Sequence, residues 1–92
     1  MSLSDPPSYT QNPDVIATAV NGEVVLLHPA DWDYFEFNKV GSAIWGLLAA
    51  PRTTDELVAA LMAAFDVERG RCHDETVAML AQLEAHGLII RN

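Results

Sequence analysis

The 92-residue chain has few basic residues and a single cysteine, and both shortages limit what it can do. Cys72 alone cannot form an internal disulfide, which fits a reducing compartment. One lysine and four arginines face 13 acidic residues, giving a formal net charge of −8. Nucleic-acid binders neutralise phosphates with Lys and Arg, so this balance argues against a nucleic-acid partner. The field of such a chain favours a neutral or basic partner surface. Alternatively, the acidic residues serve only to keep a small apolar domain soluble.

Long apolar runs and targeting signals are also missing. No stretch approaches the roughly 20 continuous apolar residues that a membrane span requires. The first residues, MSLSDPPSYTQNP, have no basic segment followed by an apolar run, so they predict no signal peptide. Half of the residues are apolar and a fifth are charged, which is typical of a globular domain. We expect a cytoplasmic protein of one domain that has no membrane partner.

The sequence has no recognisable catalytic or cofactor-binding motif. His28, His73 and His86 lie far apart and lack the spacing of a histidine zinc motif. Cys72 and His73 are adjacent, so their side chains point in different directions and do not form a nucleophile–base pair. A glycine-rich nucleotide-binding loop is absent. We therefore expect no catalytic residues, no metal and no cofactor.

Proline content divides the chain into an arm and a domain. Residues 1–13 contain three of the five prolines together with Ser, Asn and Gln, which predicts a flexible N-terminal arm. Residues 14–92 have the alternation and periodicity of a folded domain.

Three strands are predicted at the start of this domain. Residues 15–20 and 23–28 are rich in β-branched and aliphatic side chains, and Asn21-Gly22 between them is a strong signal for a type I′ hairpin turn. Pro29-Ala30-Asp31 makes the next turn, and the aromatic segment 32–37 forms the third strand. An antiparallel meander is the simplest arrangement of these three strands.

Three helices are predicted to follow the meander. Asn38 can cap a helix that runs to about Ala49 before Pro51. Residues 53–56, TTDE, form a capping box at the start of the second helix. Asp74 caps a third helix that runs to about His86, with Gly87 as its left-handed terminal residue. Residues 88–90 are apolar and predict a short strand that packs on the core.

The third helix has an unusually broad apolar face. Val77, Leu80 and Leu83 share one side at 100° per residue, and Thr76 and Met79 widen it. One flank of this helix can therefore face a groove. Alternatively, Met79 is a flexible side chain that fills a gap in the core.

The order of these elements resembles the PqqD-like family, also called RiPP recognition elements, over about residues 14–91. The matching segments are YFEFN at 34–38, GSAIWGLL at 41–48, TTDEL at 53–57, and Leu80 to Leu83 with Gly87-Leu88-Ile89. Members that serve pyrroloquinoline quinone synthesis typically carry Pro-Glu before the core of the third strand, where this chain has HPAD at 28–31. The chain is more similar to the stand-alone elements of lasso-peptide clusters.

The resemblance implies an α+β, winged-helix-like fold and a non-catalytic function. Such proteins bind the leader of a ribosomally made precursor peptide, which adds as a strand beside the third strand and against the third helix. They deliver it to a modifying enzyme such as a peptidase, a cyclase or a radical enzyme. Carried over to this chain, the peptide-binding residues are Trp32, Asp33, Tyr34, Phe35, Glu36, Thr76, Met79, Leu80 and Leu83.

Side-chain alternation adds an expectation about the third strand. Phe35 and Phe37 should face the core, and Trp32, Tyr34 and Glu36 the opposite side, although a slip of one residue would exchange the two sets.

Other functions are compatible with the same elements. The chain can be an adaptor subunit that binds a folded protein, and an open strand edge can also pair with a second copy in a homodimer. A winged-helix DNA-binding protein would place the third helix in the major groove. Asp74 and Glu75 would then face phosphates, which is electrostatically unfavourable.

Overall fold

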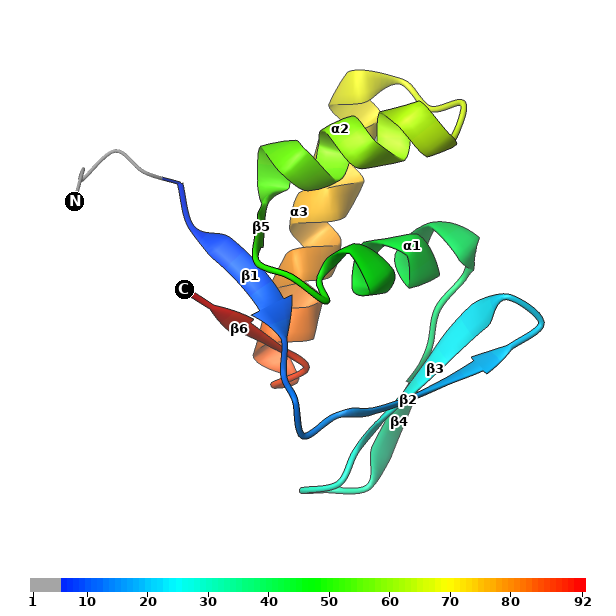
Figure 1. Cartoon of the computed structure of the whole chain (residues 1–92), viewed down its shortest axis with the longest axis vertical. Helices are drawn as coiled ribbons and strands as arrows, with labels where there is room; N and C mark the ends of the chain where they lie inside the picture. Colours follow the sequence, from blue (N-terminus) through cyan, green and yellow to red (C-terminus); the bar gives the residue numbers. More distant parts are fainter. Residues whose placement is uncertain (1–5) are drawn as a thin grey trace.

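The computed structural model describes residues 6–92, which fold into two small sheets and three helices (Figure 1). The elements are β1 (Ser8–Gln11), β2 (Ile16–Val20), β3 (Glu23–His28), β4 (Asp33–Glu36), α1 (Lys39–Leu47), β5 (Arg52–Thr53), α2 (Thr54–Ala64), α3 (Arg69–Ala85) and β6 (Ile89–Arg91). The predicted α+β class, a meander of three strands followed by three helices, is confirmed.

The meander is an antiparallel sheet in the order β2-β3-β4. Asn21 and Gly22 have φ values of 54° and 80°, as the predicted type I′ turn requires. Leu26 in the central strand pairs with Ala17 on one side and Phe35 on the other. Val24 and Leu26 are buried on the helix-facing side of the sheet, and Val25 and Leu27 alternate with them on the other side.

The third strand is shorter than the prediction at its start. Trp32 has a left-handed φ of 59°, and its amide donates to the His28 carbonyl oxygen at 2.8 Å. The β3–β4 connection therefore includes Trp32, and β4 begins at Asp33. A left-handed conformation is uncommon for a bulky residue, so nothing in the aromatic run signalled this boundary.

A second sheet, in the order β5-β1-β6, joins the two ends of the described chain. Tyr9 in β1 pairs with Arg91 in β6, whose guanidinium lies 5.5 Å from the Tyr9 ring centre. The predicted strand after Gly87 is confirmed as β6. The arm predicted over residues 1–13 differs from the structure at residues 8–11, which form β1; residues 1–5 of that arm lie outside the described residues.

The first two helices begin at the predicted caps. The Asn38 side chain accepts from the Gly41 amide at 2.9 Å at the start of α1. Thr53 and Glu56 exchange the two hydrogen bonds of the predicted capping box at the start of α2. Both helices therefore start where short-range side-chain chemistry places them.

The third helix begins earlier than the prediction. It starts at Arg69 instead of Asp74, because the Glu68 carboxylate accepts from the amides of Gly70 and Arg71, each at 2.9 Å. Gly87 has a φ of 71° after the helix, which confirms its predicted left-handed conformation.

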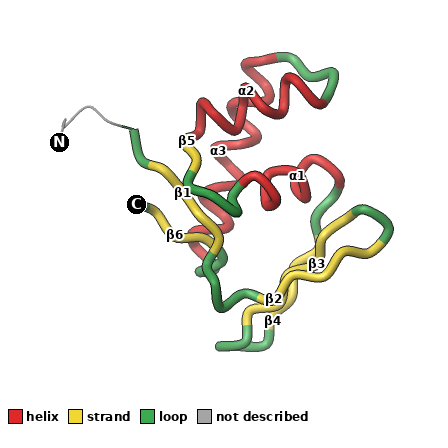
Figure 2. Tube along the Cα trace, viewed as in Figure 1, coloured by secondary structure: helices red, strands yellow, loops and turns green. Residues whose placement is uncertain are grey.

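The core lies where the helices meet the two sheets (Figure 2). Its fully buried side chains are Leu26, Leu48, Leu57, Val58, Leu61, Thr76, Leu83 and Leu88. The Trp45 side chain in α1 is only 6% exposed. No helix within residues 6–92 has the length and apolar character to cross a membrane.

Candidate functional site

A groove of about 780 Å³ runs between the end of β4 and the exposed side of α3. One wall is the β4–α1 connection with the first turns of α1, and the other is the end of α2 with the α2–α3 loop. The lining residues are Glu36, Phe37, Asn38, Val40, Gly41, Ile44, Leu61, Phe65, Asp66, Val67, Glu68, Arg71, Cys72, Glu75, Thr76, Ala78, Met79 and Gln82.

The floor of the groove is apolar and closely packed around Gly41. A Cβ atom at this position would lie 3.1 Å from Met79 Cε and 3.1 Å from Phe37 Cβ. Glycine therefore allows α1, α3 and the β4–α1 connection to approach one another at this point. Met79 is half-buried and contacts the core as well as the groove, so it combines the two roles predicted as alternatives.

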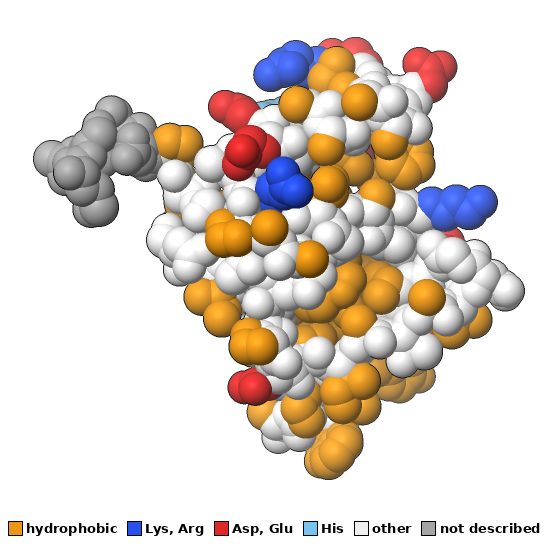
Figure 3. Space-filling model, in the orientation of Figure 1, with side chains coloured by type: hydrophobic (Ala, Val, Ile, Leu, Met, Phe, Trp, Pro, Cys, Tyr) orange, Lys and Arg blue, Asp and Glu red, His pale blue; other side chains and the backbone are white. Residues whose placement is uncertain are grey.

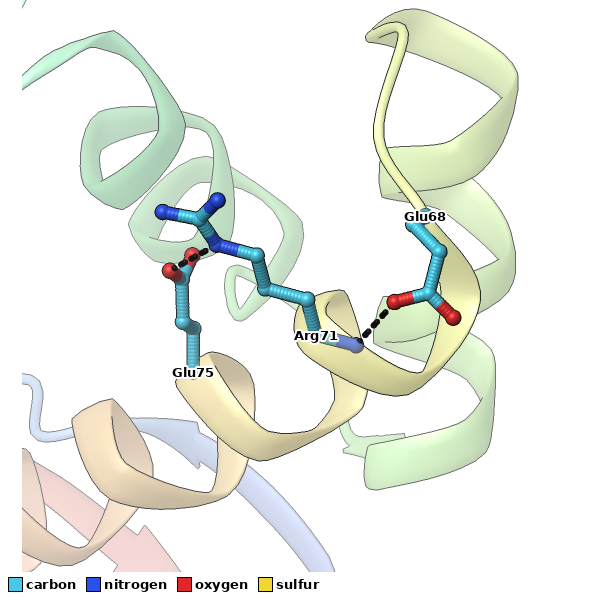
Figure 4. A network of polar contacts seen from close by, with 3 residues as sticks. All are labelled: Glu68, Arg71 and Glu75. Carbon is cyan, nitrogen blue, oxygen red and sulfur yellow. Dashed lines mark hydrogen bonds and ion pairs between the residues drawn. The ribbon is translucent and has the colours of Figure 1, made fainter.

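The rim of the groove is mainly acidic. Asp66, Glu68 and Glu75 contribute carboxylates, and Arg71 is the one basic residue in the lining. The Arg71 side chain donates from Nε to Glu75 Oε1 at 3.0 Å, while its backbone amide donates to Glu68 (Figure 4). Arg71 is therefore already paired within α3, and the rim carries a net negative charge.

The helix start also affects the acidity of Glu68. The backbone amide of Arg71, followed by that of Gly70, donates to the carboxylate and lowers the pKa of Glu68 from its ordinary value. The carboxylate is therefore ionised at neutral pH. It lies at the N-terminal end of α3, where the helix dipole favours negative charge.

One edge of β4 is open beside this groove. Within residues 6–92, β4 pairs with β3 and no strand pairs with its other edge. The Phe37 amide donates to the Val24 carbonyl oxygen, so the backbone groups of Phe35 and Phe37 point toward β3. By alternation, the amides and carbonyls of Tyr34 and Glu36 point outward. These four groups are available to an extended chain.

The structure brings together only part of the predicted peptide-binding set. Glu36, Thr76 and Met79 line the groove. Leu80 and Leu83 are buried in the core and do not line it, because α3 turns these positions away from the opening.

The remaining predicted residues lie on β4 and the turn before it. Phe35 is half-buried, with its ring centre 4.8 Å from that of His86, whereas Asp33 is exposed. Tyr34 is exposed, as expected for the side of the sheet away from the core, and Trp32 is exposed in the connection before β4.

Residues of the α2–α3 loop were missed by the prediction. Phe65, Asp66, Val67 and Glu68 all line the groove, but the sequence predicted a third helix that starts only at Asp74 and gave no binding role to these residues. Glutamate is not among the preferred N-cap residues, and Gly70 falls in the first turn of α3. The one available signal was the carboxylate two residues before Gly70.

Within the described part of the chain, no group of three or more His, Cys, Asp or Glu side chains is placed to hold a metal ion. Cys72 is a free, buried cysteine. The chemistry that the groove offers is backbone hydrogen bonding at β4, apolar contact with its floor, and electrostatic selection at its rim.

The family model described as Coenzyme PQQ synthesis protein D (PqqD) matches residues 23–89, which is most of the chain. The chain belongs to the PqqD family. This match includes β3, β4, all three helices and the groove, while β1 and β2 lie before it.

Two solved structures resemble this PqqD-family protein. The first, "TbiB1 in Complex with the TbiA(beta) Leader Peptide", is 31% identical with a TM-score of 0.79, covering 87% of this chain and 93% of that one. The second, "Lasso peptide synthetase B1 complexed with the leader peptide", is 18% identical with a TM-score of 0.77, covering 89% and 96%, and at this identity it supports the fold alone. No curated protein matches the chain.

Proposed function

We propose that this protein binds the leader region of a ribosomally made precursor peptide of the lasso type and has no catalytic role itself. The observation that carries the proposal is the apolar groove beside the open edge of β4. The relative that is 31% identical over nearly the whole domain was solved with a leader peptide, which supports a peptide as the ligand. The family membership supports the same class of function.

Strand addition explains how such a peptide is held. The outward amides and carbonyls of Tyr34 and Glu36 offer hydrogen bonds to any extended chain, which gives affinity without sequence selection. Alternate side chains of the peptide then point toward the groove, where Phe37, Gly41 and Met79 form its floor. Apolar anchors on the peptide therefore provide specificity.

The contact set proposed here modifies the predicted one. It keeps residues 32–36 together with Met79 and with Thr76, which is buried but lines the groove. It replaces the buried Leu80 and Leu83 by groove residues, namely Phe37, Gly41, Phe65 and Val67.

The acidic rim sets a further condition on the peptide. Asp66, Glu68 and Glu75 line the opening, and the whole chain has a formal charge of −8. An acidic peptide segment would be repelled at this rim, whereas a neutral or basic segment would be attracted to it. Because the rim is exposed, added salt should weaken this selection more than it weakens backbone pairing.

After binding, the chain would present the peptide to a modifying enzyme, such as a leader peptidase, in the cytoplasm. A recognition protein without its own catalytic groups needs such a partner for any chemistry on the bound peptide.

The test compares two substitutions on α3. Met79→Asp places a charge on the apolar floor, so we expect leader affinity to fall by about 2 kcal/mol or more. Val77→Asp is the matched control, since Val77 is exposed on the same helix and does not line the groove. Its expected effect is less than about 0.5 kcal/mol.

Calorimetric titration with synthetic leader peptides measures both effects. The TbiA(beta) leader and the leader encoded beside this chain's own gene serve as ligands, and a scrambled leader serves as the negative control. Circular dichroism checks that each variant is folded. Equal affinity of wild type and folded Met79→Asp would show that the peptide lies elsewhere.

A further inference from the structure

The side of the β2-β3-β4 sheet that faces away from the helices forms a second apolar surface, which we call the outer face. Its apolar members are Ile16, Val20, Val25, Leu27 and Tyr34, and Thr18, Glu23 and Glu36 share this side of the sheet. The register aligns Ile16, Leu27 and Tyr34 in one row across the three strands. Ile16 is 51% exposed, Val20 52% and Tyr34 67%, so side chains that normally pack are left in solvent.

The exposed Trp32 lies next to this surface, in the β3–β4 connection. Its side chain is 70% exposed. The space-filling view shows hydrophobic side chains gathered at this end of the sheet (Figure 3). Scattered single apolar residues need no explanation on a protein surface, but a contiguous set across three strands marks an interaction site.

The charges around the outer face indicate what kind of partner it fits. Residues 14–37 contain five acidic side chains and no lysine or arginine. Glu23 and Glu36 lie on the outer face beside Val20 and Val25, whereas Asp14, Asp31 and Asp33 are exposed outside it. Two copies of the chain joined through this face would bring acidic residues together on both sides, which opposes a symmetric dimer. A surface with an apolar centre and a rim of Lys and Arg is complementary to it.

We propose that the outer face is the docking site for the enzyme that modifies the bound leader, and that this enzyme presents an apolar patch bordered by basic residues. The proposal rests on the proposed function, because the leader must be bound for delivery to matter. The backbone groups at the open edge of β4 point within the plane of the sheet, whereas the side chains of the outer face project perpendicular to that plane. Enzyme and leader can therefore occupy the protein at the same time.

The strand β2 provides variants that separate the two surfaces. Ile16 and Val20 lie on the outer face but are two strands away from the open edge of β4. Threonine keeps the β-branched shape that a strand favours while adding a hydroxyl group. The double variant Ile16→Thr/Val20→Thr thus removes apolar character with little disturbance of the fold. Val77→Thr is the matched control, because Val77 is 44% exposed on α3, outside this sheet.

The experiment measures two affinities for each variant. The probes are a leader peptidase of a lasso-peptide cluster, immobilised on a biosensor, and the leader peptide in calorimetry. For the double variant we expect enzyme binding to weaken by about tenfold or more, and leader binding to stay within about twofold of wild type. Val77→Thr should leave both affinities unchanged. Glu23→Lys should weaken enzyme binding and reduce its dependence on salt.

Several results would overturn the proposal, and none depends on leader binding. Unchanged enzyme affinity in the double variant would place the enzyme elsewhere, and so would an equal loss in Val77→Thr. Absence of any binding between the wild-type chain and the enzyme would exclude docking altogether. A dimer in sedimentation that the double variant abolishes would assign the outer face to a second copy. Failure of the wild type to bind leader would instead overturn the proposed function.

Discussion

The two tryptophans of the chain occupy opposite environments and allow a controlled test of the core. Trp45 is 6% exposed and Trp32 is 70% exposed. A tryptophan buries up to about 250 Å², so the Trp45 ring removes roughly 200 Å² of largely apolar surface from water, worth about 5 kcal/mol at 25 cal/mol per Å². Alanine retains a small part of this burial. We therefore expect Trp45→Ala to lower the free energy of unfolding by about 3 to 5 kcal/mol.

Such a loss is a large part of the free energy of unfolding of a domain this size, which is typically about 5 to 14 kcal/mol. Trp32→Ala should cost about 1 kcal/mol or less, because most of its ring already contacts water. Urea unfolding followed by circular dichroism at the helix signal measures both variants without relying on tryptophan fluorescence. A loss below about 1 kcal/mol for Trp45→Ala, or equal losses for the two variants, would refute this account of the core.

Three further predictions concern the helices. Glu68→Gln should be less stable than wild type at neutral pH. Because the folded-state pKa of Glu68 is lowered, this difference should be complete above about pH 5 and should shrink as pH falls through that pKa; urea midpoints across this range measure it. Gly41→Ala should weaken leader binding, since the new methyl group meets Phe37 and Met79, whereas Gly46→Ala meets no atom within 4 Å and should stabilise α1 by about 0.5 to 1 kcal/mol without changing affinity. Asn38→Ala removes the α1 cap and should cost about 1 kcal/mol in the same unfolding assay.

Features set by neighbouring residues could be predicted from the sequence. The Asn21-Gly22 turn and the capping box at Thr53 depend on side chains within three or four residues, and both are present. The same reasoning located the left-handed Gly87. In each case, a local conformational preference and the tertiary structure agree.

Features that depend on contacts between residues far apart in the chain could not be predicted from the sequence. Strand β1 is four residues long and exists through pairing with β5 and β6, which lie more than 40 residues away. One wall of the groove is the α2–α3 loop, and its position depends on where α3 starts. There Glu68 acts as an unusual N-cap before Gly70. Periodicity also grouped Leu80 and Leu83 with Met79, although α3 packs against α2 on one side and lies beside β6 at its end. A helix covered on more than one side has no single buried face, so spacing alone cannot identify which residues line an opening.

The strand β4 explains how one short segment can serve two partners. Its backbone groups at Tyr34 and Glu36 point along the sheet toward the open edge, whereas the side chains of the same residues point out of the plane on the outer face. A side-chain substitution at Tyr34 therefore alters the outer face and leaves the hydrogen-bonding groups of the edge in place. Tyr34→Pro, in contrast, removes an outward amide. We expect Tyr34→Thr to weaken enzyme docking more than leader binding and Tyr34→Pro to weaken leader binding, so paired titrations of these two variants measure the edge and the outer face separately. An equal loss of leader affinity in both variants would show that the peptide contacts the tyrosine ring instead of the backbone edge.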